Sequence, residues 1–163
     1  MDSRFLAGSR VLRCPMKASD DFAMTFNGEL WACDTSVAVA ALDPAHEAHP
    51  ACRRALVELR PALAGHAAFE TYSVLTRLPF PLRLSADQAV SVLAAAFPGD
   101  CWLDAAGTRD LRERLGVLDI VGGSVYDALV GQASVANGRT LLTRDRRAER
   151  TYRSLQVEYR FVG

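Results

Sequence analysis

The segment Gly122–Asp145, GGSVYDALVGQASVANGRTLLTRD, decides the fold of this chain. Its first part predicts a helix that begins after two glycines, carries Asp127 near its start and ends at Asn137-Gly138. Apolar residues follow one side of this helix: Ala128, Leu129, Val130, Ala133 and Val135. Such a pattern is typical of a helix that covers a sheet.

A short strand and an acid follow this helix. The apolar run at 140–143 predicts the strand, and Asp145 comes just past its carboxyl end, where open α/β sheets bind ligands. The fold can therefore bring Asp127 and Asp145 together. Carboxylates that share a cleft repel each other unless a cation or hydrogen-bond donors compensate them. We therefore hypothesise a divalent metal site.

The rest of the chain alternates between strands and helices. In chain order, the pattern predicts a strand at 30–33, helices at 37–42 and 45–59, a strand at 61–65, a helix at 67–78, a helix from a Ser85 cap to Phe97, a strand at 101–103, a helix at 105–115, and, after the opening segment, a basic helix with Arg146, Arg147, Arg150 and Arg153 and an edge strand at 157–162. This order implies a three-layer α/β/α sandwich with a mostly parallel sheet.

Two expectations concern large side chains. In the helix at 67–78 we expect Phe69, Val74 and Leu75 to face the core, which leaves Glu70 near the helix start. We expect Trp31 and Trp102 to be core aromatics beside strands rather than platforms on which bases stack.

The composition fits one domain. The chain has 163 residues, 50% of them hydrophobic, which is enough for a sizeable core. The formal net charge is zero, so no bulk field attracts nucleic acid or an anionic membrane, and RNA binding requires a local patch. No apolar run approaches the ~20 residues of a membrane span. We expect residues 28–163 to form the domain and residues 1–27 to be an N-terminal extension outside its core.

The cysteines favour a reducing compartment. Cys14, Cys33, Cys52 and Cys101 form no CxxC pair and lie in or beside apolar runs. Buried, reduced thiols in a cytoplasmic protein explain this placement. We therefore expect a cytoplasmic localisation.

Four acids stand out by position: Asp34 after the first strand, Glu70 and Asp127 near helix starts, and Asp145 after a late strand. Mg²⁺ and Mn²⁺ prefer oxygen ligands, and metals held by carboxylates favour hydrolysis of a phosphodiester. Each acid alone has another explanation, since Asp34 can cap the next helix and Glu70 can interact with a helix dipole. Those explanations do not account for the shared neighbourhood of the four acids.

Four motifs contain these acids: CDTSV at 33–37, FETYSVLTR at 69–77, GGSVYDAL at 122–129 and LTRDRRA at 142–148. In this order and spacing the chain resembles the PIN-domain ribonucleases of the VapC toxin type, from type II toxin–antitoxin systems. The resemblance covers about residues 28–163 and includes all four acids.

The resemblance implies a Mg²⁺- or Mn²⁺-dependent endoribonuclease, a hydrolase that cuts RNA. It implies that the metal-binding and catalytic acids are Asp34, Glu70, Asp127 and Asp145. It further implies a homodimer and a cognate antitoxin protein that neutralises the toxin.

Polar and basic residues beside the acids are further candidates. Thr35, Ser36 and Thr143 can position a carboxylate or a water, and the resemblance assigns Ser36 and Thr143 such a role. Arginines can grip an RNA backbone, and the candidates are Arg112, Arg144, Arg146 and Arg147. The alternative for these arginines is a solvated helix face with surface ion pairs.

Two other functions remain open at this level. A phosphoacceptor receiver or a haloacid-type phosphatase also places an Asp after the first strand. The receiver requires a late lysine that this region lacks, and the phosphatase requires an Asp where Ser36 stands. The other alternative is a catalytically inactive PIN-like module that binds RNA or a protein, against which the complete set of acids argues.

Overall fold

The centre of the fold is a four-stranded sheet in the order β2-β1-β3-β4, with all neighbouring strands parallel. The computed structural model describes residues 28–99 and 101–163, so the extension predicted at residues 1–27 lies outside the described residues. The strands are β1 (Leu30–Cys33), β2 (Ala62–Leu63), β3 (Arg139–Thr143) and β4 (Tyr159–Phe161). Four of the five predicted strands are confirmed, at 30–33, 62–63, 139–143 and 159–161, and β4 lies at an edge as predicted.

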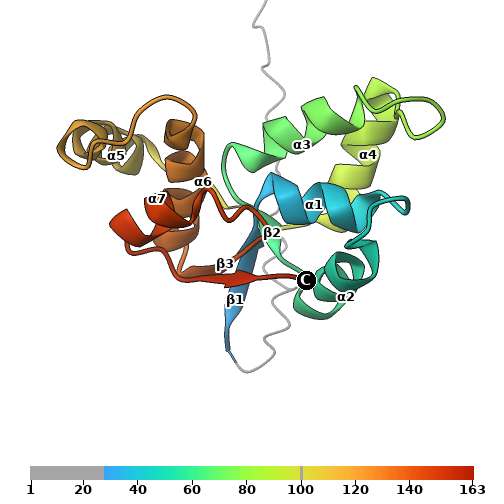
Figure 1. Ribbon diagram of the computed structural model, residues 1–163, viewed down its shortest axis with the longest axis horizontal. Helices are drawn as coiled ribbons and strands as arrows, with labels where there is room; N and C mark the ends of the chain where they lie inside the picture. Colours follow the sequence, from blue (N-terminus) through green and yellow to red (C-terminus); the bar gives the residue numbers. More distant parts are fainter. Residues whose placement is uncertain (1–27, 100) are drawn as a thin grey trace, which may run out of the picture.

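Seven helices connect these strands in the part of the chain that the structure describes: α1 (Thr35–Leu42), α2 (His49–Leu59), α3 (Ala67–Leu75), α4 (Ala86–Ala96), α5 (Ala105–Val117), α6 (Ser124–Ala136) and α7 (Glu149–Ser154). Figure 1 shows α6 and α7 on one side of the central strands and α1 and α2 on the other. The predicted α/β/α sandwich is therefore confirmed. None of the described helices has the length and apolarity needed to span a membrane.

The order of the strands places the candidate site. From β1 the chain moves outward to β2, returns past β1 to β3, and continues outward to β4. The direction of travel thus changes between β1 and β3, where parallel α/β sheets open a crevice at their carboxyl ends. Cys33 pairs with Leu142, and the Asp34 amide continues the ladder by donating to the Leu142 carbonyl over 3.1 Å. The residues that follow β1 and β3 therefore lie side by side.

Helix α6 packs closely because its buried face carries small residues. Ala128, Gly131, Ala133 and Ser134 are buried there. A Cβ added at Gly131 would lie 2.8 Å from a methyl carbon of Val157, so only glycine allows this approach. The predicted helix is confirmed, except that its predicted apolar side also included Val135, which is 40% exposed.

The predicted strand at 101–103 is wrong. This segment has no regular structure, and its carbonyls are satisfied individually: the Gly65 amide donates to Cys101 over 2.7 Å, and the Asn137 side chain donates to Trp102 over 3.0 Å. A run of three apolar residues does not distinguish a strand from a buried loop. Cys101 is fully buried, but Trp102 is 44% exposed, so the prediction of a core residue at Trp102 is also wrong. Trp31 is buried as predicted.

The orientation predicted for α3 is wrong at Phe69. The buried residues of this helix, Ala67, Thr71 and Leu75, are spaced by four and define its inner face. Phe69 lies halfway between two of them, on the opposite side, and is 65% exposed.

Helix α2 begins at His49 rather than at the predicted residue 45. Side-chain acceptors hold the preceding residues in turns: Asp43 accepts from the Ala45 amide, and the His46 ring accepts from the Ala48 amide. Such local bonds compete with helix formation.

The three described cysteines, Cys33, Cys52 and Cys101, are buried and free, as predicted. Burial raises the pKa of each thiol, most strongly that of Cys33, so these residues remain protonated packing groups. Cys14 lies outside the described residues.

Candidate active site

A cleft of about 660 Å³ lies at the carboxyl ends of β1 and β3, and all four predicted acids line it. Asp34 follows β1, Glu70 comes from the first turn of α3, Asp127 from the first turn of α6, and Asp145 follows β3. Four elements that are far apart in the sequence therefore bring one carboxylate each to the same cavity.

Asp34 is the most firmly held of these acids. It is 6% exposed, and its Oδ1 accepts hydrogen bonds from the Ser36 hydroxyl over 2.6 Å and from the Val37 amide over 3.0 Å. Its Oδ2 accepts from the Thr143 hydroxyl over 2.5 Å. Asp34 is thus the cap of α1 and also a lining residue of the cleft, so both explanations of this residue apply. Burial raises its pKa, and these three donors oppose the rise.

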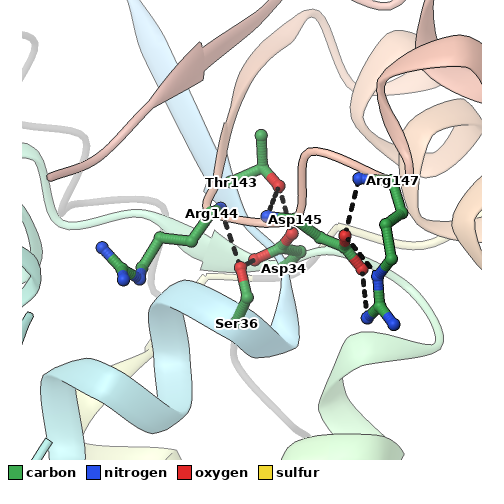
Figure 2. A network of polar contacts seen from close by, with 6 residues as sticks. All are labelled: Asp34, Ser36, Thr143, Arg144, Asp145 and Arg147. Atoms are coloured by element: carbon green, nitrogen blue, oxygen red, sulfur yellow. Dashed lines mark hydrogen bonds and ion pairs between the residues drawn. The ribbon is translucent and has the colours of Figure 1, made fainter.

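Two hydroxyl groups join the loops that follow β1 and β3. The Thr143 hydroxyl donates to Asp34 and accepts from the Asp145 amide over 3.0 Å. The Ser36 hydroxyl donates to Asp34 and accepts from the Arg144 amide over 2.8 Å. Figure 2 shows this network around the Asp34 carboxylate. One wall of the cleft is therefore fixed by hydrogen bonds within the chain.

Asp145 is paired with Arg147. The guanidinium donates to both carboxylate oxygens over 3.2 Å, and the Arg147 amide donates to Oδ1 over 2.8 Å. Burial acts to raise the pKa of Asp145, but the hydrogen bonds and charge of Arg147 outweigh it, and the pKa lies below its usual value.

Asp127 has no such partner. Among the hydrogen bonds of residues 28–99 and 101–163, none reaches its carboxylate. Burial raises the pKa of Asp127 to about 6, and the nearby charges of Asp145, Asp34 and Glu70 add to the rise, with Arg147 opposing. The four carboxylates therefore interact electrostatically with one another. The negative charge of Asp127 is the one that no hydrogen bond from the described residues compensates.

Glu70 stands at the open side of the cleft. Its side chain is exposed, and the Thr35 hydroxyl donates to its Oε2 over 2.6 Å. This bond connects the start of α1 to the start of α3 at the edge of the cleft.

The family model of the PIN domain matches residues 32–154, which include all four acids. The chain belongs to the PIN-domain family. Its relatives include a protein named Ribonuclease VapC40 from Mycobacterium tuberculosis (strain CDC 1551 / Oshkosh), 48% identical over 131 residues, which are 79% of this chain and 96% of the relative. Ribonuclease VapC27 from Mycobacterium tuberculosis (strain ATCC 25618 / H37Rv) is 44% identical over 126 residues, 77% of this chain and 92% of that one. The predicted membership of the VapC type of PIN domain is confirmed.

The donor set of this PIN domain fits a hard divalent cation. Carboxylate oxygens are the ligands that Mg²⁺ and Mn²⁺ prefer. A cation would relieve the repulsion that adds to the effect of burial on the pKa of Asp127. Within the described residues, no three His, Cys, Asp or Glu side chains stand close enough together to hold one ion in the observed arrangement. Binding would therefore require the carboxylates to turn toward a common point.

Three of the four arginines predicted to contact RNA, Arg112, Arg144 and Arg146, do not line the cleft of the PIN domain. The Arg144 guanidinium donates to the Val162 carbonyl and pairs with Glu47. Figure 2 shows the Arg144 side chain extending away from Asp145 and Arg147. Arg146 lies over the Phe161 ring, 4.5 Å from its centroid, and Arg112 is exposed on α5. Arg147 is the arginine that lines the cleft.

Sequence analysis missed three aromatic residues that line the cleft: His66, Tyr126 and Tyr152. His66 lies one helical turn before Glu70, and Tyr126 immediately precedes Asp127, so helical spacing from the acids was the available signal. Tyr152 is buried, and burial raises its pKa, with Asp34 and Asp127 adding to the rise. Its phenol therefore stays neutral.

Proposed function

We propose that this PIN domain is a Mg²⁺- or Mn²⁺-dependent endoribonuclease and the toxin of a toxin–antitoxin pair. The observation that carries the proposal is that four carboxylates from four elements line one cleft. Burial, together with the charges of the other three acids, raises the pKa of Asp127 to about 6. Such a concentration of negative charge is typical of a site that holds a cation. The similarity to two VapC ribonucleases over more than three quarters of the chain supports RNA as the substrate.

The four acids would hold the metal. A bound divalent cation supplies the positive charge that favours attack of water on the phosphorus and stabilises the departing oxygen. Asp34, fixed by Ser36, Val37 and Thr143, gives the site a rigid reference point. Asp145, after β3, and Asp127, on α6, would complete the site.

Arg147 is the group that we propose to bind the RNA backbone within the cleft. Its side chain is 93% exposed and already bonds an anionic partner, Asp145, through two nitrogens. A phosphate can take the same place on the guanidinium, whose forked donors suit it.

The partners follow from the same proposal. A cognate antitoxin would neutralise the enzyme, and two copies of the chain would form a homodimer in the cytoplasm. The support is the resemblance to toxins of the VapC type, since the structure describes one chain.

The test compares RNA cleavage by the wild-type protein with cleavage by the Asp127→Asn variant, in Mg²⁺ and in EDTA. Asp127→Asn keeps the side-chain shape and removes a charge that would face the cation, so we expect cleavage to fall at least about 100-fold. EDTA should have the same effect on the wild-type protein. Asp110→Asn is the matched control, because Asp110 is a surface acid of α5 that pairs with Arg114.

Equal activity of the wild-type and Asp127→Asn proteins would exclude the assignment of the acids. RNA binding without cleavage by the wild-type protein, in Mg²⁺ and in Mn²⁺, would favour the alternative of a catalytically inactive PIN-like module.

A further inference from the structure

Two pairs of aromatic rings lie beside the acidic cleft. His66 and Tyr126 are stacked, with ring centroids 4.7 Å apart and planes 24° apart, and both residues line the cleft. Phe69 and Trp102 form a tilted pair with centroids 5.5 Å apart. Tyr126 is 54% exposed, and Phe69 and Trp102 are also largely exposed. We call these four residues the aromatic ledge.

The ledge is continuous along the first turn of α3. His66 and Phe69 are three residues apart at the start of this helix, so their side chains are neighbours on its surface. Glu70, one of the four acids, directly follows Phe69. The ledge therefore extends outward from the cleft, and its first pair belongs to both.

The scaffold holds the ledge in place. Gly65 has φ +48°, and a Cβ at this position would lie 3.1 Å from the Ala133 Cβ, so glycine allows α3 to start against α6. The same residue donates its amide to Cys101 over 2.7 Å, and Asn137 donates to the Trp102 carbonyl over 3.0 Å. These contacts fix the segment that carries Trp102 between α3 and the end of α6.

Exposed rings beside a nuclease cleft suit one kind of ligand. Unpaired bases stack on aromatic side chains in proteins that bind single-stranded RNA, and this contact tolerates any base because each has a π face. Three rings of the ledge also carry polar atoms that can bond to base edges: the His66 imidazole, the Tyr126 hydroxyl and the Trp102 N–H. An aliphatic docking groove for a protein helix would lack these atoms.

We infer that the aromatic ledge stacks unpaired bases of a single-stranded RNA segment whose backbone enters the acidic cleft. The inference rests on the proposed function and assigns the four rings of the ledge to the bases next to the cut site. Because the first ring pair is part of the cleft, a base on the ledge adjoins the phosphate at the acids. The ledge therefore positions the substrate, while the acids carry the chemistry.

The test measures binding of a labelled single-stranded oligoribonucleotide of mixed sequence by fluorescence anisotropy. The parent protein is the full chain with Asp127→Asn in Mg²⁺, so that the RNA stays intact. Phe69→Leu keeps an apolar, exposed side chain but removes the ring. We expect it to weaken binding roughly 5- to 100-fold.

Two variants and a second RNA complete the design. Phe69→Tyr keeps an aromatic ring and should bind as the parent does. Phe80→Leu is the matched control, because Phe80 is 90% exposed in the loop that joins α3 to α4. Figure 1 shows that this loop lies at the end of α3 away from α6. An oligonucleotide of the same length with abasic residues should bind parent and Phe69→Leu equally, because only bases stack.

The outcomes separate the ledge from the proposed function. Equal binding of the base-containing RNA by the parent and Phe69→Leu would overturn the inference that the ledge stacks bases, even if the wild-type chain cleaves RNA. Unchanged RNA binding together with loss of self-association by Phe69→Leu would also overturn it and assign the surface to a second copy of the chain. Absence of metal-dependent cleavage by the wild-type protein would reject the proposed function, while the binding comparison would still decide whether the ledge stacks bases.

Discussion

The two walls of the acidic cleft hold their carboxylates in different ways. On the strand wall, formed by the loops after β1 and β3, Asp34 and Asp145 accept hydrogen bonds from neighbouring residues. On the helix wall, formed by α6, Asp127 receives none from the described residues and is repelled by the other acids. The strand wall is therefore organised without a cation, whereas the helix wall retains the charge that a cation would neutralise.

Among the variants that compare the two walls, we expect the largest effect when the hydrogen bonds of the strand wall are removed. Thr143→Val keeps the shape of a fully buried side chain but removes the donor to Asp34 and the acceptor for the Asp145 amide. We expect RNA cleavage to fall about 10- to 100-fold, as for other residues that orient metal ligands. The free energy of unfolding should fall by about 1–3 kcal/mol, because a buried carboxylate and an amide lose partners.

Thr140→Val provides the control on the same strand. Thr140 is also buried, but its hydroxyl donates to Glu29 rather than to an acid of the cleft. This variant should lose stability and retain activity. If both variants lost activity to the same extent, the effect of Thr143 would be one of general strand stability, and the strand wall would have no special role.

A smaller effect tests the helix wall through pH. Because the pKa of Asp127 is about 6 in the folded chain and lower when unfolded, the folded chain binds more protons between pH 4 and pH 6. The stability of the metal-free protein should therefore fall as pH rises through this range. Solvent screens this half-buried group, so we expect the free energy of unfolding to fall by roughly 1 kcal/mol. The midpoint of thermal unfolding should fall by about 2–4 °C.

Thermal unfolding in EDTA between pH 4 and pH 7 measures this effect. In Asp127→Asn the midpoint should fall less as pH rises, whereas Asp110→Asn on α5 should show the same fall as the wild-type protein. Mg²⁺ should raise the midpoint more at pH 7 than at pH 5, because protonated Asp127 no longer attracts the cation. A decline that persists unchanged in Asp127→Asn would assign it to another group, with Asp34 the next candidate since burial also raises its pKa.

The sequence predicts the two walls on different grounds. The carboxyl ends of parallel strands lie at one edge of their sheet, so the acids that follow β1 and β3 are close together whichever way their side chains point. Helix α6 could be predicted because glycines flank a long segment whose apolar residues recur at helical spacing. The convergence of the acids on one cleft followed from these features, while their roles in metal binding and catalysis remain predictions.

Side-chain direction was the part that the sequence did not reveal. Arg144, Arg146 and Arg147 are equivalent as sequence, but they lie in a turn with no period, and only Arg147 lines the cleft. Phe69 was assigned to the core because it is large and apolar, yet the inner face of α3 is built from Ala67, Thr71 and Leu75. The side of α3 that faces the core carries mostly small residues, and its close packing leaves no room there for the ring of Phe69.

The smallest expected effect concerns the ion pair between Arg147 and Asp145 on the exposed side of the strand wall. Arg147 bonds both oxygens of Asp145, so it competes with a cation for them. Arg147→Gln should raise the affinity for Mg²⁺ roughly two- to five-fold, a small factor because the guanidinium is exposed and screened. RNA binding should weaken in the same variant and become less sensitive to salt, because a phosphate contact is lost.

Calorimetric titration of Mg²⁺ without RNA, and RNA binding at several salt concentrations, measure these opposite changes. Arg150→Gln, an exposed arginine of α7, is the control and should change neither Mg²⁺ affinity nor the salt dependence. A fall in Mg²⁺ affinity in Arg147→Gln would mean that the guanidinium orients Asp145 for the cation instead of competing with it. In that case the strand wall would depend on Arg147 as it does on Thr143, and both carboxylates of this wall would be organised by the chain before a cation binds.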